Sequence, residues 1–191
     1  MLNIVLFGAP GCGKGTQSEL MQEKYSLLHI STGDIIRKEI AAKSEIGEQL
    51  QALIERGELA PDALVVEMIA NYLREHQGVK GIIFDGFPRT TAQAEAFDEM
   101  LTKMGESVGV MIDMDVPEEE LVKRILLRGA VSGRADDQSE DIIRNRISVY
   151  NRQTAIVADY YRAQGKHRSV PSLGTIEEVS ERIGAVIEEL L

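Results

Sequence analysis

The sequence predicts an α/β protein built on a doubly wound, parallel five-stranded sheet. Short apolar runs, many of them β-branched, alternate with longer helical segments along the whole of the 191 residues. This alternation is typical of parallel sheets that carry helices on both faces. The first apolar run breaks into a glycine-rich turn that leads into a helix. We find no repeat and no low-complexity linker, so the length suits one compact domain with small inserted lobes.

The first predicted strand, residues 2–7, is apolar apart from Asn3, as strands buried on both faces are. The glycines that follow allow the backbone to turn successive N–H groups onto one anion, and the helix that begins near Lys14 adds the positive end of its dipole. Gly8, four further residues, and then Gly13 and Lys14 have the spacing of a phosphate-binding loop. The stretch therefore predicts a P-loop whose lysine reaches the outer phosphates of a nucleoside triphosphate.

One position of this loop departs from the general pattern. A Ser or Thr that binds Mg²⁺ usually follows the lysine, whereas here Gly15 intervenes and the hydroxyl belongs to Thr16. We therefore expect Mg²⁺ to rest on phosphate oxygens and water, without a direct protein ligand. Two alternatives remain for the loop: a glycine-rich turn without a ligand, and a dinucleotide-binding turn, which would need glycine in place of Thr16.

The other elements follow from apolar runs and from residues that start or stop helices. Ser31 and Thr32 are placed to cap a helix, Gly57 ends one, and Pro61 and Pro117 open others. The strands predicted after the first are residues 27–30, 81–85, 108–116 and 167–170, and the helices are residues 16–25, 35–42, 45–56, 63–75, 91–104, 121–127, 139–163 and 175–191.

Two segments do not fit the regular alternation. Residues 31–60 contain more helix than a simple crossover needs, and they are predicted to form a small inserted lobe. Residues 128–137 are small or charged, and they are predicted to form a mobile loop, or lid, bracketed by Gly129 and Gly133. The core of the domain then comprises residues 1–30, 61–127 and 138–191.

The composition argues against several classes of protein. Thirty-one acidic against 21 basic residues give a formal net charge of −10, which disfavours binding to nucleic acid or to an anionic membrane. Cys12 is the single cysteine, so an intrachain disulfide and a Cys-rich zinc site are excluded, and we interpret it as a spacer within the loop. No segment has the pattern of a leader or of a membrane span, so we expect a cytoplasmic monomer.

Charged residues at the predicted strand ends are the candidates for chemistry. Asp85 ends an apolar strand, in the position of the acidic residue that helps to hold Mg²⁺ in P-loop enzymes, directly or through water. Its alternative role is to cap the loop 86–89. Guanidinium groups that converge on phosphates would position them and offset the charge of a phosphoryl group in transfer. The candidate arginines are Arg37, Arg89, Arg124, Arg128, Arg134, Arg144 and Arg146.

Five motifs in order make the chain resemble the nucleoside monophosphate kinases from end to end, and the adenylate kinase family most closely. They are GAPGCGKGT at residues 8–16, STGD with Arg37, GELAPD at residues 57–62, DGFPR with Gln93, and GRADD at residues 133–137. The lid resembles the short form of the family, which lacks a long insertion and its zinc cysteines. In GELAPD, Ala60 stands where many relatives carry valine, a small change in an apolar contact.

The resemblance implies the reversible transfer of a phosphoryl group from ATP, bound with Mg²⁺, to AMP, which gives two ADP and balances the adenine nucleotides. It implies an ATP site that comprises Gly11, Cys12, Gly13, Lys14, Gly15, Thr16, Arg128 and Gly174. In this site Arg128 and Gly174 would lie near the adenine, and Arg124 would lie near the phosphates. It implies an AMP site that comprises Thr32, Arg37, Glu58, Leu59, Ala60, Gly86, Phe87, Pro88, Arg89, Gln93, Arg134 and Arg146. The catalytic residues that it implies are Lys14, Arg89, Arg124, Arg134 and Arg146.

Two other functions remain open at this point. A UMP/CMP kinase would share the phosphate machinery, but relatives that act on pyrimidines tend to have Ala in place of Thr32 and Asn in place of Gln93. A glutamine amide can pair with the donor and the acceptor of an adenine edge. A nucleotide-binding switch without useful turnover is the other alternative, although a switch would not need a second nucleotide site.

Overall fold

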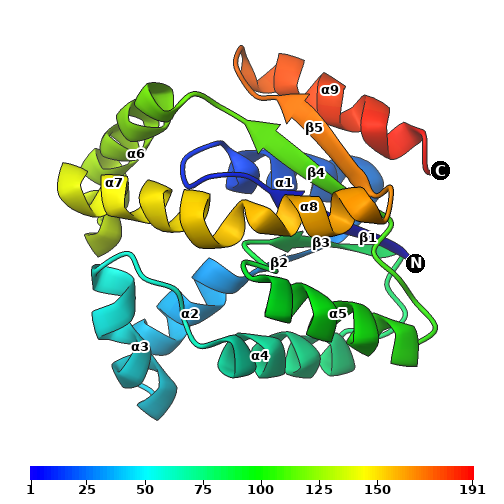
Figure 1. Cartoon of the computed structure of the whole chain (residues 1–191), viewed down its shortest axis with the longest axis horizontal. Coiled ribbons are helices and arrows are strands. Elements are labelled where there is room, and N and C mark those ends of the chain that lie inside the picture. Colours follow the sequence, from blue (N-terminus) through cyan, green and yellow to red (C-terminus); the bar gives the residue numbers. More distant parts are fainter.

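A five-stranded sheet in which all neighbouring strands are parallel runs through the centre of the computed structural model, which describes residues 1–191 (Figure 1). The strand order is β2-β3-β1-β4-β5. This sheet confirms the predicted fold class. The strands are β1 (Leu2–Phe7), β2 (Leu28–Ser31), β3 (Gly81–Asp85), β4 (Val110–Asp115) and β5 (His167–Pro171).

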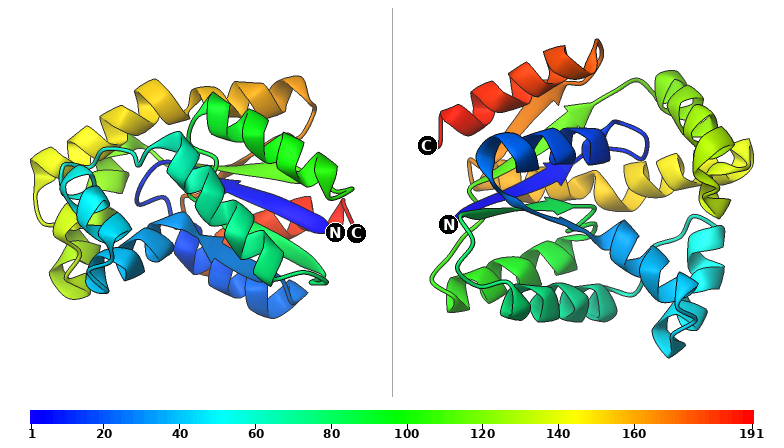
Figure 2. Two further views of the ribbon diagram at one scale, coloured as in Figure 1. Left: turned by 90° about the horizontal axis from the view of Figure 1, so that it is seen from below. Right: turned by 180° about the vertical axis from the view of Figure 1, so that it is seen from behind.

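The three central strands, β1, β3 and β4, contribute to two separate cores, because successive side chains of a strand point to opposite faces of the sheet. In β1, Val5 and Phe7 belong to one apolar cluster, and Ile4 and Leu6 belong to the other. Helices cover both faces (Figures 1 and 2). Buried side chains of α4 (Asp62–Glu75), α5 (Thr91–Lys103) and α8 (Ile156–Ala163) join the first cluster, and those of α1 (Lys14–Tyr25) and α9 (Ile176–Glu188) join the second.

Hydroxyl side chains start several of the helices, as their sequences predict. The Ser31 side chain accepts a hydrogen bond from the Asp34 N–H, so α2 (Thr32–Ala41) begins three residues before its predicted start. Thr175 and Glu178 form a reciprocal capping box at the start of α9. No helix of the structure combines the length and the apolar composition that crossing a membrane requires.

The helices α2 and α3 (Glu45–Glu55) form a hairpin at the end of the molecule that lies away from both chain termini (Figures 1 and 2). Ser44 ends the short connection, and its side chain accepts a hydrogen bond from the Gly47 N–H. A Cβ atom at Gly47 would overlap the carbonyl group of Glu39 in α2. The close contact between the two helices therefore depends on the absence of a side chain at Gly47.

The predicted lid loop, residues 128–137, is wrong in its first half. The helix α6 (Glu118–Ser132) continues through Arg128 and ends at Gly133, whose φ of 65° closes it. A 3₁₀ turn, Ala135–Asp137, then folds back so closely that a Cβ atom at Gly129 would overlap the carbonyl of Asp137. Gly129 therefore lies within a helix in this structure, where the absence of a side chain permits helix-to-turn packing.

The single long helix predicted for residues 139–163 is also interrupted. α7 (Glu140–Val149) passes into a π-helical turn, Tyr150–Thr154, before α8 begins. The extra residue of a π turn shifts the side chains that follow it around the helix axis, and such turns are frequent at functional sites. Here the two ends of the turn, Tyr150 and Thr154, face the cleft described below.

The α2–α3 packing gives a test of the fold. Replacing Gly47→Ala should destabilise the hairpin by about 1–3 kcal/mol, because the added methyl group forces the two helices apart. Amide hydrogen exchange in residues 45–55, measured by mass spectrometry, should then quicken by about ten- to a hundredfold.

The matched control is Gly15→Ala, because Gly15 is also helical but has no heavy atom within 4 Å of the added methyl position. This control should leave exchange in α3 unchanged. Equal exchange in α3 of the Gly47→Ala variant and the parent chain would contradict the packing explanation.

Candidate active site

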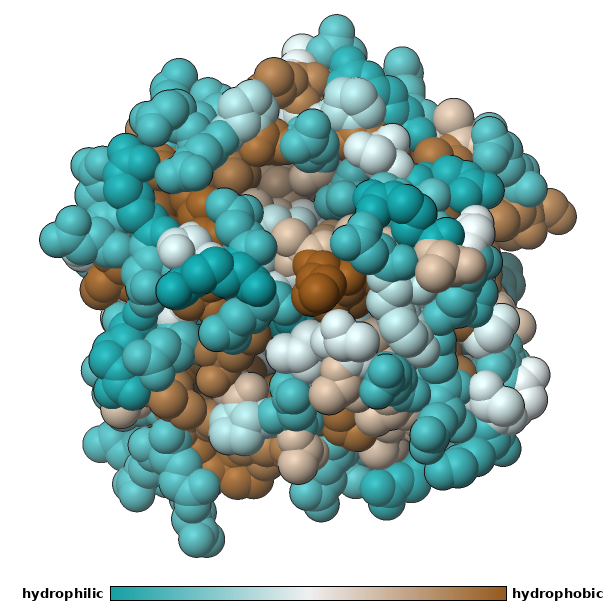
Figure 3. Space-filling model, in the orientation of Figure 1, coloured by the Kyte–Doolittle hydropathy of each residue, from teal (hydrophilic) through white to brown (hydrophobic).

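The carboxyl ends of the parallel strands open onto one cleft of about 770 Å³. Its lining includes Gly8 after β1, Ser31 in β2, Asp85 in β3, Met114 in β4 and Ser172 after β5. The chain leaves β1 toward one edge of the sheet and later crosses to the other edge, and ligands bind at such a switch point. Figure 3, in the orientation of Figure 1, shows a face of the molecule covered mainly by hydrophilic residues, with apolar ones in patches between them.

All the site residues predicted for the two nucleotides and for catalysis line this cleft, from Gly11 to Gly174. Arg144 does not, because it forms ion pairs with Glu118, Glu119 and Glu140 outside the cleft. Sequence reasoning did not assign several other lining residues. Among these are Gln17, Met114, Tyr150 and Thr154.

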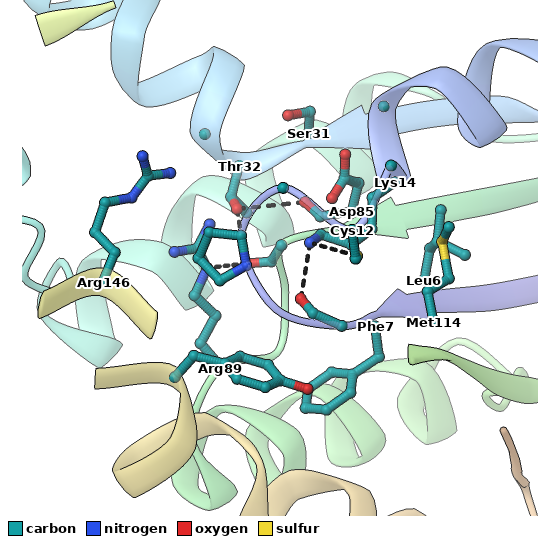
Figure 4. Close-up of a pocket in the computed structure, with 18 of the residues that line it drawn as sticks. Leu6, Phe7, Cys12, Lys14, Ser31, Thr32, Asp85, Arg89, Met114 and Arg146 are labelled. Atoms are coloured by element: carbon teal, nitrogen blue, oxygen red, sulfur yellow. Dashed lines mark hydrogen bonds between the residues drawn. The ribbon is translucent and has the colours of Figure 1, made fainter. Parts of the chain in front are cut away.

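The P-loop, residues 8–16, is held in its curved form by glycines with backbone angles that other residues rarely adopt. Gly13, with φ at 105°, stands immediately before α1 and turns the chain into the helix. Lys14 lies at the start of α1 (Figure 4). Its ammonium folds back and donates to the carbonyl oxygens of Gly8 at 2.8 Å and Ala9 at 3.2 Å. The positive end of α1 and the lysine charge therefore lie at the same place, as an anion site requires.

Cys12 is almost fully buried beneath this loop, with its sulfur 3.6 Å from Lys14 Nζ. Burial raises the pKa of the thiol, and the nearby Lys14 ammonium opposes this only in part. The side chain is therefore a neutral, packed group. This agrees with its interpretation as a spacer.

Six arginines reach the cleft from different elements. Arg124 of α6 donates to the carbonyl of Ser172 at 3.4 Å and of Cys12 at 3.5 Å, which places its guanidinium beside the P-loop. Arg89 follows β3, and its Nε donates to Gly86 O at 2.7 Å. The full set is Arg37, Arg89, Arg124, Arg128, Arg134 and Arg146.

The electrostatics of these arginines favour an anionic ligand. Burial, together with the charge of Arg146 and Arg37, lowers the pKa of Arg89 from its usual value. Burial, together with the charge of Arg37 and Arg128, likewise lowers the pKa of Arg134. Both groups stay charged, but their charge is incompletely compensated. Phosphate oxygens would supply the missing compensation.

Two buried carboxylates hold part of this set in place, and sequence reasoning missed their role. Asp137, whose side chain is fully buried, accepts from Arg128 Nε at 2.6 Å and from Arg146 Nη1 at 2.6 Å. Asp136 also pairs with Arg146, at 2.9 Å. Burial alone would raise the pKa of the Asp137 carboxyl, but the hydrogen bonds from Arg128 and the charge of Arg146 outweigh it and hold the pKa below its usual range.

Thr32, Gly86 and Gln93 form the lower part of the cleft wall that lies opposite the P-loop. Thr32 is buried, and its hydroxyl donates to Gly86 O at 2.8 Å. Gln93 is also buried, and it joins the backbone of Arg89 to the carboxylate of Asp62. The sequence gives no sign of this role for Asp62, which directly precedes the predicted helix 63–75, because its partner Gln93 lies 31 residues away in the chain.

The α2–α3 hairpin and the turn after α6 meet across the mouth of the cleft. Arg134 lies 3.8 Å from the carboxylate of Asp34, which also accepts from Arg37 at 2.5 Å. Asn145 in α7 donates to the carbonyl of Arg56 at 2.7 Å. The two segments are thus in contact in this structure.

Comparisons with known proteins agree with this geometry. A family model described as adenylate kinase matches residues 6–166. The chain is 52% identical to the adenylate kinase of Parabacteroides distasonis, 50% identical to that of Phocaeicola vulgatus and 47% identical to that of Flavobacterium johnsoniae, and each match covers 100% of both chains. A P-loop at a sheet switch point, a cleft lined with arginines and relatives of the same length lead to one conclusion: the chain belongs to the adenylate kinase family.

Proposed function

We propose that this cleft carries out the reversible transfer of the γ-phosphoryl group of MgATP to AMP, giving two ADP, as its family membership indicates. The observation that carries the proposal is the presence of two separate groups of cationic side chains in one cleft. One set is the P-loop with Lys14, and the other comprises arginines from the opposite wall, Arg37 and Arg89 among them. A coupled assay that supplies ATP with AMP, CMP, UMP or GMP in turn tests it, and turnover should be fastest with AMP.

On the ATP side, the backbone N–H groups of Gly11 to Thr16 cradle the phosphates, and the Lys14 ammonium moves from the loop carbonyls to the outer phosphates. Arg124 is beside the loop and contacts the same phosphates. Arg128 and Gly174 flank the adenine. The open space around Gly15 supports this arrangement, because no atom beyond its chain neighbours and its own helix backbone lies within 4 Å of its missing side chain.

On the AMP side, Arg37 and Arg89 bind the phosphate, and Thr32 and Gln93 face the base. The remaining residues of this site shape the pocket around the nucleoside, and they are Glu58, Leu59, Ala60, Gly86, Phe87 and Pro88. Ala60 and Phe87 are buried apolar groups, which suits contact with a purine.

Transfer needs no covalent intermediate, so catalysis rests on position and charge. Arg89, Arg134 and Arg146 close on the phosphoryl group as it moves between the two nucleotides. Their guanidinium groups offset the charge that spreads over its oxygens in the transition state. The lowered pKa values of Arg89 and Arg134 support this role, because they indicate positive charge that no protein carboxylate fully balances.

Mg²⁺ would travel with ATP and neutralise phosphate charge when bound. Asp85 lines the cleft near Lys14 (Figure 4), and a carboxylate oxygen is a ligand type that Mg²⁺ prefers. His29 Nε2 lies 3.6 Å from Asp85 Oδ2. We assign Asp85 to the metal through water.

The hairpin lobe, residues 31–60, and the lid, residues 128–137, act as covers that part to admit nucleotides and close to exclude water. A closed cleft prevents the loss of the phosphoryl group to water. The contact of Arg134 with Asp34 supports closure of these two segments against each other, and Asn145 of α7 contacts the hairpin lobe at Arg56. Because one chain supplies the whole lining, we also propose that the protein acts as a monomer, and its single buried cysteine fits a cytoplasmic location.

The first test of this proposal addresses the phosphate loop. Lys14→Met removes the charge at the outer phosphates and should lower kcat/KM by about a thousandfold, since several kcal/mol of transition-state stabilisation are lost. Lys24→Met is the matched control, because Lys24 lies on the same helix but pairs with Glu188 at the surface. Near-normal turnover by the Lys14 variant would remove Lys14 from the mechanism.

The second test addresses base choice. Gln93→Ala should lower the preference for AMP over CMP, in kcat/KM, by about 5- to 150-fold, because a lost buried pairing costs about 1–3 kcal/mol. Gln51→Ala, an exposed change in α3, should leave this preference as it is. If the Gln93 variant keeps the parent preference, the base is read by other residues.

The third test addresses closure. A bisubstrate ligand in which a chain of phosphates links two adenosines should slow amide exchange in residues 31–60 and 133–137. At about 100 times its dissociation constant, the ligand opposes opening by roughly 2.7 kcal/mol, which corresponds to about a hundredfold slower exchange. Exchange in α8, outside both covers, should change less. Unchanged exchange in residues 133–137 would leave Arg134 without its proposed role.

A further inference from the structure

Gln93 is held at both ends of its side-chain amide by groups of the protein. The backbone N–H of Arg89 donates to Gln93 Oε1 at 2.7 Å, and Gln93 Nε2 donates to Asp62 Oδ1 at 2.8 Å. The same Asp62 oxygen accepts from the hydroxyl of Thr90 at 3.0 Å. Gln93 itself is only 1% exposed, so water does not compete for these bonds.

The chemistry of the two partners fixes which way the amide points. A backbone N–H can only donate, so it requires the oxygen of the amide, and a carboxylate oxygen requires the nitrogen. Rotating the amide by half a turn would place two donors together at Arg89 and two acceptors together at Asp62. The reversed orientation therefore loses both hydrogen bonds and creates two repulsive contacts.

Each end of the amide can still make one more hydrogen bond. The nitrogen carries a second hydrogen and the oxygen a second lone pair, because each makes only one of its two hydrogen bonds in this network. Gln93 lines the cleft, whereas Asp62 and Thr90 do not and stand behind it. The remaining donor and acceptor thus face a ligand in an order that Asp62 helps to set.

We propose that Asp62 is a positioning residue that fixes the donor–acceptor order of Gln93 and thereby makes the cleft reject monophosphates of 6-oxopurines. This inference rests on the proposed function, in which Gln93 faces the base. Adenine offers an acceptor at N1 and a donor at its 6-amino group, which match the order. Hypoxanthine offers a donor at N1 and an acceptor at O6, which oppose it at both positions.

Inosine monophosphate is therefore the sharpest probe, since it differs from AMP only at this edge. Cytosine has the same order of acceptor and donor as adenine. Because cytosine is a smaller, single-ring base, this edge lies farther from Gln93 when the arginines hold the phosphate. A purely structural role for Asp62, as the first residue of α4 and a partner of Thr90, would affect AMP and inosine monophosphate equally. The ratio of the two kcat/KM values separates the two roles.

The experiment measures that ratio in the full chain, with ATP as donor, for Asp62→Ala, Asp62→Asn, Gln93→Ala and the double variant Asp62→Ala/Gln93→Ala. Asp62→Ala should lower the preference for AMP by about tenfold, because one of the two bonds that oppose rotation of the amide is gone. Asp62→Asn keeps an accepting oxygen but also offers an amide hydrogen that can pair with the reversed amide, so its ratio should lie between those of the parent chain and Asp62→Ala. In the Gln93→Ala background, Asp62→Ala should cause no further change, since the group on which it acts is absent.

The ratio does not depend on how much of each preparation is folded. Asp62→Ser, which retains a residue favoured at helix starts, provides the same readout if the alanine variant is inactive. An unchanged ratio in Asp62→Ala and in Asp62→Ser, with a lowered ratio in Gln93→Ala, would overturn the inference but leave the proposed function in place. An unchanged ratio in Gln93→Ala as well would instead overturn the assignment of Gln93 to the base.

Discussion

Mutual repulsion among the arginines of the cleft is the constraint on which the rest of the structure depends. Six guanidinium groups face one cavity of about 770 Å³, in a protein whose net charge is −10. Asp137 and Asp136 neutralise part of this charge from a buried position, and backbone carbonyls such as Gly86 O take a further share. The remainder is left for phosphates, so the cleft is electrostatically incomplete without its substrates.

The parallel sheet makes this concentration of charge possible. Because the carboxyl ends of all its strands meet at one edge, residues from distant parts of the chain arrive together without a long loop. The rigid cores on both faces then fix the loop ends, while the α2–α3 hairpin and the turn after α6 meet over the cleft. The two cores thus hold the strand ends beneath the cleft, while the hairpin and the turn after α6 make the contacts across its mouth.

Local patterns were sufficient to predict the strands and the P-loop, because each depends on neighbours in the sequence. Most residues of the two nucleotide sites followed instead from the resemblance to a family, and they line the cleft. What local patterns could not predict depends on distant partners. The end of α6 was placed too early because Arg128 and the small residues after it look like a loop, and only the packing of Gly129 on Asp137 extends the helix. The π turn at Tyr150 and the bond from Gln93 to Asp62 carry no local signal either.

The position of the Lys14 ammonium has a consequence for which anions the loop can hold. It is already solvated by the carbonyls of Gly8 and Ala9, so an incoming anion must displace two good acceptors before it gains this charge. A singly charged or small anion, such as chloride or bicarbonate, offers little in exchange. A polyphosphate supplies several charged oxygens at once. The hydrogen bonds of Lys14 to the loop therefore weaken the binding of monovalent anions more than the binding of polyphosphates.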